Sequence, residues 1–174
     1  VQIIPNGIAL PRGAPLTADD SDAYRHGMGL GEQCRRVVGT VGMLRADRKP
    51  WLLVEVFAAV ARKAGPDVHF LIAGAGPEME HVQRQAEAAG IGDRLHLPGL
   101  VRDSRLAFSL IDVYVTLNVG SLTGIAALEA SLAGCPVVAI QLSAEYQRSA
   151  DDLIWSSTDL DEVATECVRL LESD

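Results

Sequence analysis

Three charged residues lie at positions where they could bind a ligand that carries negative charge and hydroxyl groups. Arg48 and Lys49 follow an apolar run that stops at Gly42. A helix is expected to start just after them. Positive charge at a helix start opposes the helix dipole, which favours an anion-binding role over a role as two solvated side chains. Glu129 interrupts residues 125–133, which are apolar nearly all round. A carboxylate there is costly unless it accepts hydrogen bonds, from a ligand, from water or from nearby backbone.

Other possible chemical motifs in the chain are weak. Gly74-Ala75-Gly76 invites a dinucleotide-binding interpretation, but the third glycine of that fingerprint is Met79, so a tight strand-to-helix turn is favoured. The cysteines are three and lack CxxC spacing, which predicts buried, reduced thiols and no metal site. The histidines show no partner spacing and are expected to be structural or exposed: His26, His69, His81 and His96.

The elements that would position these residues alternate regularly from residue 36 onward. Apolar runs predict strands at 37–42, 68–73, 94–97, 111–117 and 136–140. Amphipathic segments predict helices at 51–64, 78–89, 102–110, 124–133 and 159–172. Continuously apolar strands separated by helices are typical of a parallel sheet covered on both faces. The sequence therefore predicts a doubly wound, Rossmann-like α/β fold whose ligand lies beyond the carboxyl ends of its strands.

The first part of the chain has a different character. Residues 1–35 predict an entry strand, a Pro5-Asn6-Gly7 turn and an irregular connection with one short helix near Asp19–Gly27. Residues 36–174 predict one Rossmann-like domain. The chain opens on Val1 within the entry strand, without a methionine, which predicts a piece of a longer protein.

Composition excludes several classes of function. The chain has 174 residues, 48% hydrophobic and 22% charged, as expected for one globular domain. A net charge of −8 argues against nucleic acid or anionic membrane as a general partner. Any bound anion must therefore be held by a local cationic cluster. No apolar run approaches the length of a membrane-spanning helix.

Read in order, the loops resemble the C-terminal, nucleotide-sugar-binding domain of retaining GT-B glycosyltransferases of the large group 1 family. That family includes many exopolysaccharide and lipid-linked glycan enzymes. VGTVGMLRADRKPWLLVEVF, residues 38–57, is similar to the family pattern VGRLxxxKxxxxLLxAF. The other matching segments are the strand opening at 1–7, DVHFLIAGAGP at 67–77, RLHLPGLV at 94–101 and the block at 112–138 that ends in EASLAGCPVV.

The resemblance implies a role for each matching residue. Glu129 would bind the ribose hydroxyls, and Arg48 would meet the diphosphate beside Lys49 and the strand-end Gly42. Leu100 would offer an apolar face to the nucleobase. The donor would be a UDP-sugar or GDP-sugar, with no metal and no other cofactor.

The chain also departs from the family pattern. Ser121 replaces the first glutamate of the E-x7-E pair, which contacts the transferred sugar in the family, so Ser121 and Thr123 are the candidates for that contact. Met43 replaces a phosphate-binding arginine, for which Arg45 is the nearest substitute. Gly124 still opens the following helix and would turn its positive end toward the ligand. The departures leave two interpretations, a divergent active enzyme or a non-catalytic nucleotide-sugar-binding or assembly module.

The leading expectation is thus half of a glycosyltransferase that acts with retention on a glycan or lipid-linked acceptor. An epimerase or phosphorylase sharing the scaffold is a further alternative, although neither lysine, Lys49 or Lys63, follows a pyridoxal-phosphate motif. The N-terminal acceptor domain is expected to be absent and the segment alone inactive, so the sequence identifies no catalytic residue. An uncovered cleft wall near residues 42–44 and 117–123 would favour self-association. The expected location is cytoplasmic. Attachment to the inner membrane face is expected only through the missing domain.

Overall fold

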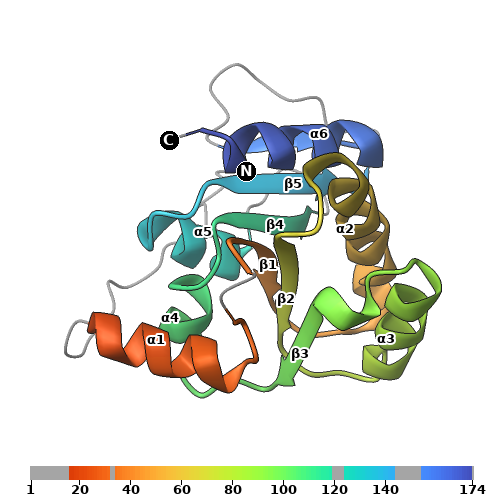
Figure 1. Cartoon of the computed structure of the whole chain (residues 1–174). Coiled ribbons are helices and arrows are strands. Elements are labelled where there is room, and N and C mark those ends of the chain that lie inside the picture. Colours follow the sequence, from red (N-terminus) through yellow and green to blue (C-terminus); the bar gives the residue numbers. More distant parts are fainter. Residues whose placement is uncertain (1–15, 32–33, 119–123, 144–153, 174) are drawn as a thin grey trace, which may run out of the picture.

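The computed structural model describes residues 16–31, 34–118, 124–143 and 154–173, which form one parallel sheet of six strands (Figure 1). The strand order is β3-β2-β1-β4-β5-β6. The strands are β1 Arg36–Val41, β2 Val68–Ala73, β3 Leu95–Gly99, β4 Val113–Asn118, β5 Val137–Gln141 and β6 Trp155–Ser157. The α-helices are α1 Ala18–Gly27, α2 Trp51–Ala64, α3 Met79–Ala88, α4 Ser104–Phe108, α5 Ile125–Leu132 and α6 Leu160–Leu171, and the short 3-10 helices are η1 Ala46–Arg48 and η2 Gly92–Arg94.

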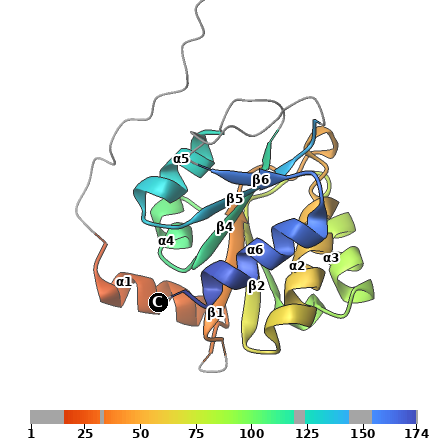
Figure 2. The same cartoon turned by 90° about the horizontal axis from the view of Figure 1, so that it is seen from above.

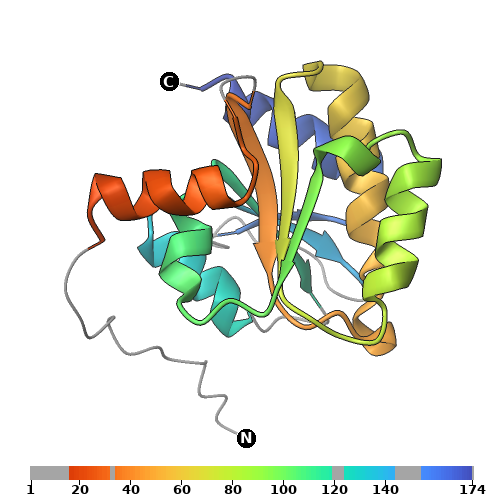
Figure 3. The same ribbon diagram turned by 60° about the horizontal axis from the view of Figure 1, so that its bottom comes forward.

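Helices cover the sheet on both faces (Figures 2 and 3). α2, α3 and α6 lie on one face, and α1, α4 and α5 lie on the other. Neighbouring residues of β1 pack on opposite faces of the sheet. Val38 is fully buried in the core under α2, and Val37 is fully buried in the core under α4. The predicted doubly wound α/β fold is therefore confirmed.

The predicted elements agree closely with the observed ones where the apolar pattern is long. α2 and β2 have the predicted bounds, and the remaining predicted helices and strands from residue 36 onward differ by one or two residues at an end. The expected short helix near Asp19–Gly27 is α1. β6 was not predicted, because a strand of three residues carries too little pattern. The expected strand at residues 1–7 lies outside the described residues.

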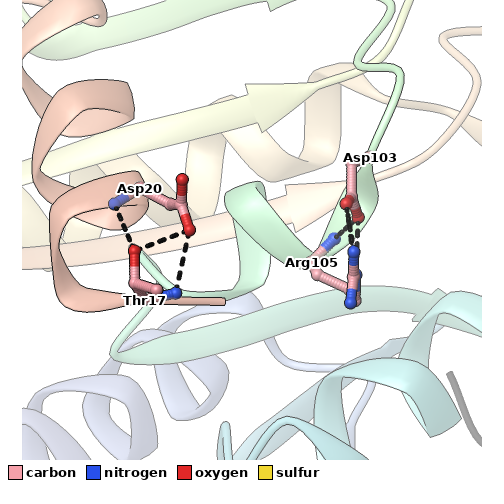
Figure 4. A network of polar contacts seen from close by, with 4 residues as sticks. All are labelled: Thr17, Asp20, Asp103 and Arg105. Carbon is pink, nitrogen blue, oxygen red and sulfur yellow. Dashed lines mark hydrogen bonds and ion pairs between the residues drawn. The ribbon is translucent and has the colours of Figure 1, made fainter. Parts of the chain in front are cut away.

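Local capping fixes the starts of α1 and α4 (Figure 4). The hydroxyl of Thr17 accepts a hydrogen bond from the backbone N–H of Asp20, whose carboxylate accepts from the backbone N–H of Thr17. Asp103 caps α4 in the same way, since its side chain accepts from the backbone N–H of Arg105 and pairs with the guanidinium of Arg105 at 2.7 Å. These caps satisfy backbone donors that a helix start leaves unpaired.

The loops after β1 and β2 are in direct backbone contact. A Cβ atom at Gly74 would overlap the carbonyl oxygen of Gly42, and one at Gly76 would overlap that of Leu44. Backbone N–H groups of Gly42 and Leu44 donate to the carbonyl oxygens of Ala73 and Ala75, at 3.0 and 3.1 Å. Gly74-Ala75-Gly76 thus forms the tight strand-to-helix turn that the sequence predicted, and close backbone packing explains its two glycines.

Adding a methyl group at this contact should destabilise the domain. We predict that Gly76→Ala lowers the free energy of unfolding by about 1–3 kcal/mol, because the neighbouring backbone must shift. Urea denaturation measures the effect. Gly31→Ala is the control, since a Cβ there meets nothing within 4 Å. Equal stability of the two variants would contradict the packing explanation.

Two histidines meet across β2 and β3 although 27 residues separate them. Nδ1 of His69 lies 3.0 Å from Nε2 of His96, with the rings stacked at 5.3 Å between centroids. Burial lowers the pKa of His69, and the nearby His96 and Arg94 lower it further. Burial also lowers the pKa of His96. The fold therefore favours the neutral form of both rings.

This pair predicts a pH-dependent stability. Just below pH 6.5, the ordinary histidine pKa, both histidines bind protons in the unfolded chain but stay neutral in the folded chain. The free energy of unfolding therefore falls as the pH falls below 6.5. We expect His69→Gln to reduce this slope between pH 7.5 and 5, measured by urea denaturation at each pH. His26→Gln, on an exposed histidine, should leave the slope unchanged. A wild-type slope in His69→Gln would show that the pair is not responsible.

Candidate functional site

A cleft of about 260 Å³ opens at the carboxyl edge of the sheet, between β1 and β4. The strand order reverses at this pair, which is where open α/β sheets bind ligands. Thr40 and Val41 of β1 line one side, and Thr116 and Leu117 of β4 line the other. The start of α5, residues 124–127, closes the end of the cleft.

Tyr114 lies beneath the cleft and joins its two strands. The β1–β4 pairing ends at Gly39 and Tyr114, and beyond it the Tyr114 hydroxyl donates to the carbonyl oxygen of Val41 at 3.0 Å. Burial raises the pKa of Tyr114, and the negative charge of Glu129 raises it as well. The Tyr114 side chain is only 1% exposed, so its hydroxyl stays protonated and acts as a donor.

Arginines supply the positive charge of the cleft. Arg45 and Arg48 both line it, and Asp47 lies between them. The Asp47 carboxylate is 3.0 Å from Nε of Arg45 and 4.0 Å from Nε of Arg48. Lys49 follows η1 in the left-handed backbone conformation, with φ of 48°, and is exposed. Among the described residues that line the cleft, the cations are thus the two arginines.

The structure gathers part of the predicted set of site residues. Gly42, Arg48 and Gly124 line the cleft. Glu129 is half-buried on α5, two residues beyond Ala127, and is not itself among the residues that line the cleft. Within the described part of the chain, Lys49 and Leu100 are not among the lining residues. Leu100 is 84% exposed on the loop after β3, and Ser121 and Thr123 lie outside the described residues.

Sequence reasoning did not single out the hydroxyl-bearing residues of the cleft. Thr40, Tyr114 and Thr116 are buried in or beside its walls. Thr40 and Thr116 interrupt otherwise apolar strands toward their carboxyl ends, in VVGTV and in VYVTLN, whereas Tyr114 is the second residue of β4. A buried polar side chain at the end of a parallel strand could have served as the signal for them.

Two apolar side chains also stand exposed at the cleft. Met43 is 66% exposed and Ile125 is 55% exposed, and both line it. Leu44, which was expected in an uncovered wall, is instead 2% exposed and packs in the core under α2. Leu44 is therefore not part of the uncovered surface, and residues 119–123 of the predicted wall lie outside the described residues.

The fold and the cleft define a Rossmann-like ligand-binding domain, and comparisons with known proteins identify its family. The family model "Glycosyl transferases group 1" matches residues 35–173. The chain belongs to this family.

Curated relatives and solved structures agree with that assignment. The chain is 28% identical over 141 residues to 2-deoxystreptamine glucosyltransferase of Streptomyces kanamyceticus, a match covering 80% of this chain and 36% of the relative. HepE of Anabaena, solved with UDP and glucose, matches with a TM-score of 0.73 at 18% identity over 91% of this chain and 44% of HepE. The C-terminal domain of the group 1 family protein LpcC from Francisella tularensis matches with a TM-score of 0.63 at 17% identity, over 80% and 76% of the two chains.

These matches confirm the Rossmann-like fold, which the chain shares with glycosyltransferases of known structure. The chain spans about a third of the length of the curated relative. In the described part of the chain, the helices are too short or too polar to cross a membrane.

The exposed apolar pair leads to a prediction about self-association. We expect the 174-residue chain to form weak dimers through Met43 and Ile125, because exposed apolar side chains gain from mutual burial. Sedimentation velocity over a concentration series should show this, and Met43→Ser with Ile125→Ser should abolish it. Leu132→Ser, at a residue 53% exposed on the same helix but outside the cleft lining, is the control. A wild-type monomer at every concentration would contradict the prediction.

Proposed function

We propose that this chain is the donor-binding domain of a retaining glycosyltransferase. A UDP-sugar or GDP-sugar would bind in the cleft between β1 and β4, and the full-length protein would transfer the sugar to a glycan or lipid-linked acceptor. The observation that carries the proposal is the position of Arg48 and the start of α5 around a cleft at the strand-order reversal, in a group 1 family member. The named activity of the relative, on 2-deoxystreptamine, adds a small aminocyclitol as an alternative acceptor.

Arg48 fits the leaving diphosphate. Glycosyl transfer breaks the bond between the anomeric carbon of the sugar and a diphosphate oxygen, and the oxygen keeps the electron pair. The nucleoside diphosphate therefore gains negative charge as it leaves, and a fixed guanidinium stabilises that charge more in the transition state than before it. In a chain of net charge −8, only such a local cation can attract the ligand. Lys49, exposed beside Arg48, would add longer-range attraction.

Glu129 and the start of α5 fit the nucleoside. The half-buried carboxylate of Glu129 can accept hydrogen bonds from both ribose hydroxyls, which supplies the partners its position requires. Gly124 opens α5 without a capping side chain from the described residues, and we propose that the first backbone N–H groups of the helix bind the ligand. Leu100, exposed on the loop after β3, would contact the base. Ser121 and Thr123 remain the proposed contacts to the transferred sugar.

A second candidate function is a non-catalytic nucleotide-sugar-binding module. Met43 favours it, because an exposed apolar side chain lines the cleft at the position where the resemblance implies a cation. The two functions differ in one measurement. Full-length protein that binds a UDP-sugar but neither transfers nor hydrolyses it would support the module and contradict the enzyme.

Nucleotide titration of the 174-residue chain tests donor binding. We expect UDP to bind more tightly than uridine, and Arg48→Met to weaken UDP only, because uridine lacks phosphate. Glu129→Ala should weaken both by about 1.5–3 kcal/mol, since both carry the ribose. Backbone NMR shifts suit the weak affinities expected of half a site.

Matched substitutions control this experiment. Arg62→Met and Glu55→Ala remove the same charges from exposed positions of α2 and should leave both affinities unchanged. Added salt should reduce the preference for UDP, because the Arg48 contact is exposed and screened over roughly 10 Å at 0.1 M. Equal losses of UDP and uridine affinity in Arg48→Met would refute the phosphate role.

A further inference from the structure

The Tyr114 phenol meets both backbone groups of Val41, the last residue of β1. Its hydroxyl donates to the Val41 carbonyl oxygen at 3.0 Å, and its oxygen accepts from the Val41 N–H at 3.4 Å. In a regular parallel sheet these two groups would bond to the backbone of the neighbouring strand. The register between β1 and β4 ends two residues earlier, at Gly39 and Tyr114. The phenol therefore takes the place of one step of the ladder between the two strands.

Val41 is also where the loop that carries the positive charge of the cleft begins. Residues 41–45 and Arg48 all line the cleft. On the β2 side, backbone hydrogen bonds of 3.0 and 3.1 Å join residues 42 and 44 to the end of β2 and the loop after it. On the β4 side, the Tyr114 phenol holds the start of the loop. Tyr114 thus supplies the attachment on the side where β1 and β4 enclose the cleft.

The Tyr114 side chain is itself held firmly. It is 1% exposed, and its ring packs against Phe108 with 5.8 Å between the ring centroids. A side chain packed in this way keeps one rotamer, so the position of its hydroxyl is set by the core of the domain. The end of β1 is therefore tied to the core through one hydroxyl group.

We propose that Tyr114 is a positioning residue for the nucleotide donor. Its hydroxyl fixes the end of β1 and thereby places the guanidinium of Arg48 opposite the start of α5. This proposal rests on the proposed function, because it concerns the same bound nucleotide. Since Tyr114 acts through Arg48, it strengthens the binding of a ligand that carries phosphate and not of one that lacks it. A phenol that bonded the ligand directly would act independently of Arg48.

A double-mutant cycle on the 174-residue chain tests this proposal, with UDP and uridine titrated by NMR shifts. Tyr114→Phe removes the hydroxyl and keeps the buried ring. It should reduce the ratio of UDP to uridine affinity by about fivefold, as for the loss of one hydrogen bond, and leave the uridine affinity nearly unchanged. In the Arg48→Met background the same substitution should have no further effect on UDP, because the group that it positions is absent.

Val163→Ala controls for a general loss of stability. Val163 lies on α6, is fully buried in the core on the other face of the sheet from Tyr114, and is not among the residues that line the cleft. Its truncation destabilises the fold without altering the cleft. It should lower the urea midpoint and keep the wild-type ratio of UDP to uridine affinity.

Amide hydrogen exchange of the wild-type chain gives a second measurement that needs no variant. Coupling is reciprocal, so if the bond between Tyr114 and Val41 favours UDP, bound UDP must favour that bond. Saturating UDP should therefore slow the exchange of the Val41 N–H by about the same factor of five relative to saturating uridine. Equal exchange rates with the two ligands would overturn the proposal, even where Tyr114→Phe does not fold.

The outcomes separate this proposal from the proposed function. Wild-type chain that shows no preference for UDP over uridine refutes the proposed function, and the inference falls with it. A ratio that Arg48→Met lowers and Tyr114→Phe leaves unchanged overturns the role of Tyr114 alone. Equal losses of UDP and uridine affinity in Tyr114→Phe would show a general structural role. Additive losses in the double variant would show a direct ligand contact, and either result overturns the positioning role.

Discussion

The hydrogen bond between the Tyr114 hydroxyl and the carbonyl oxygen of Val41 holds the cleft in its shape. Backbone pairing between β1 and β4 stops at Gly39 and Tyr114, so the two strands can separate toward their carboxyl ends. Beyond that point the Tyr114 hydroxyl gives the carbonyl oxygen of Val41 a donor from β4, a hydrogen bond worth about 0.5–1.5 kcal/mol. The buried phenol supplies the link and leaves room above itself. Both walls of the cleft depend on that arrangement.

The sequence predicted most of the fold because the sheet is buried on both faces. Such strands are continuously apolar, and glycine or proline marks the ends of strands and helices alike. The bounds of α2 and β2 were therefore predicted to the residue. β6 escaped prediction because three residues, Trp155–Ser157, contain no periodicity. Its pairing with β5 is a tertiary fact that the local sequence does not encode.

The sequence singled out a candidate site residue only where the residue type was unusual for its own segment. Arg48 opposes a helix dipole and Glu129 interrupts an apolar helix, and both could be found from the sequence. The geometry of Arg45 and Asp47 depends on a 3-10 turn, and the meeting of His69 with His96 depends on the strand register. The histidine contact arises from packing between distant segments, and the turn that brings Arg45 to Asp47 is too short to leave a sequence pattern. Residue type and spacing therefore do not reveal them.

The backbone contact between the loops after β1 and β2 constrains how this domain can diversify. Leu44 accepts a hydrogen bond from the backbone N–H of Glu78 at 3.1 Å, so the β1 loop is joined to the start of α3 as well as to the Gly-Ala-Gly turn. Neither loop can gain or lose a residue without breaking its partner's hydrogen bonds. The wall of the cleft that residues 42–44 form would therefore be inherited with the fold.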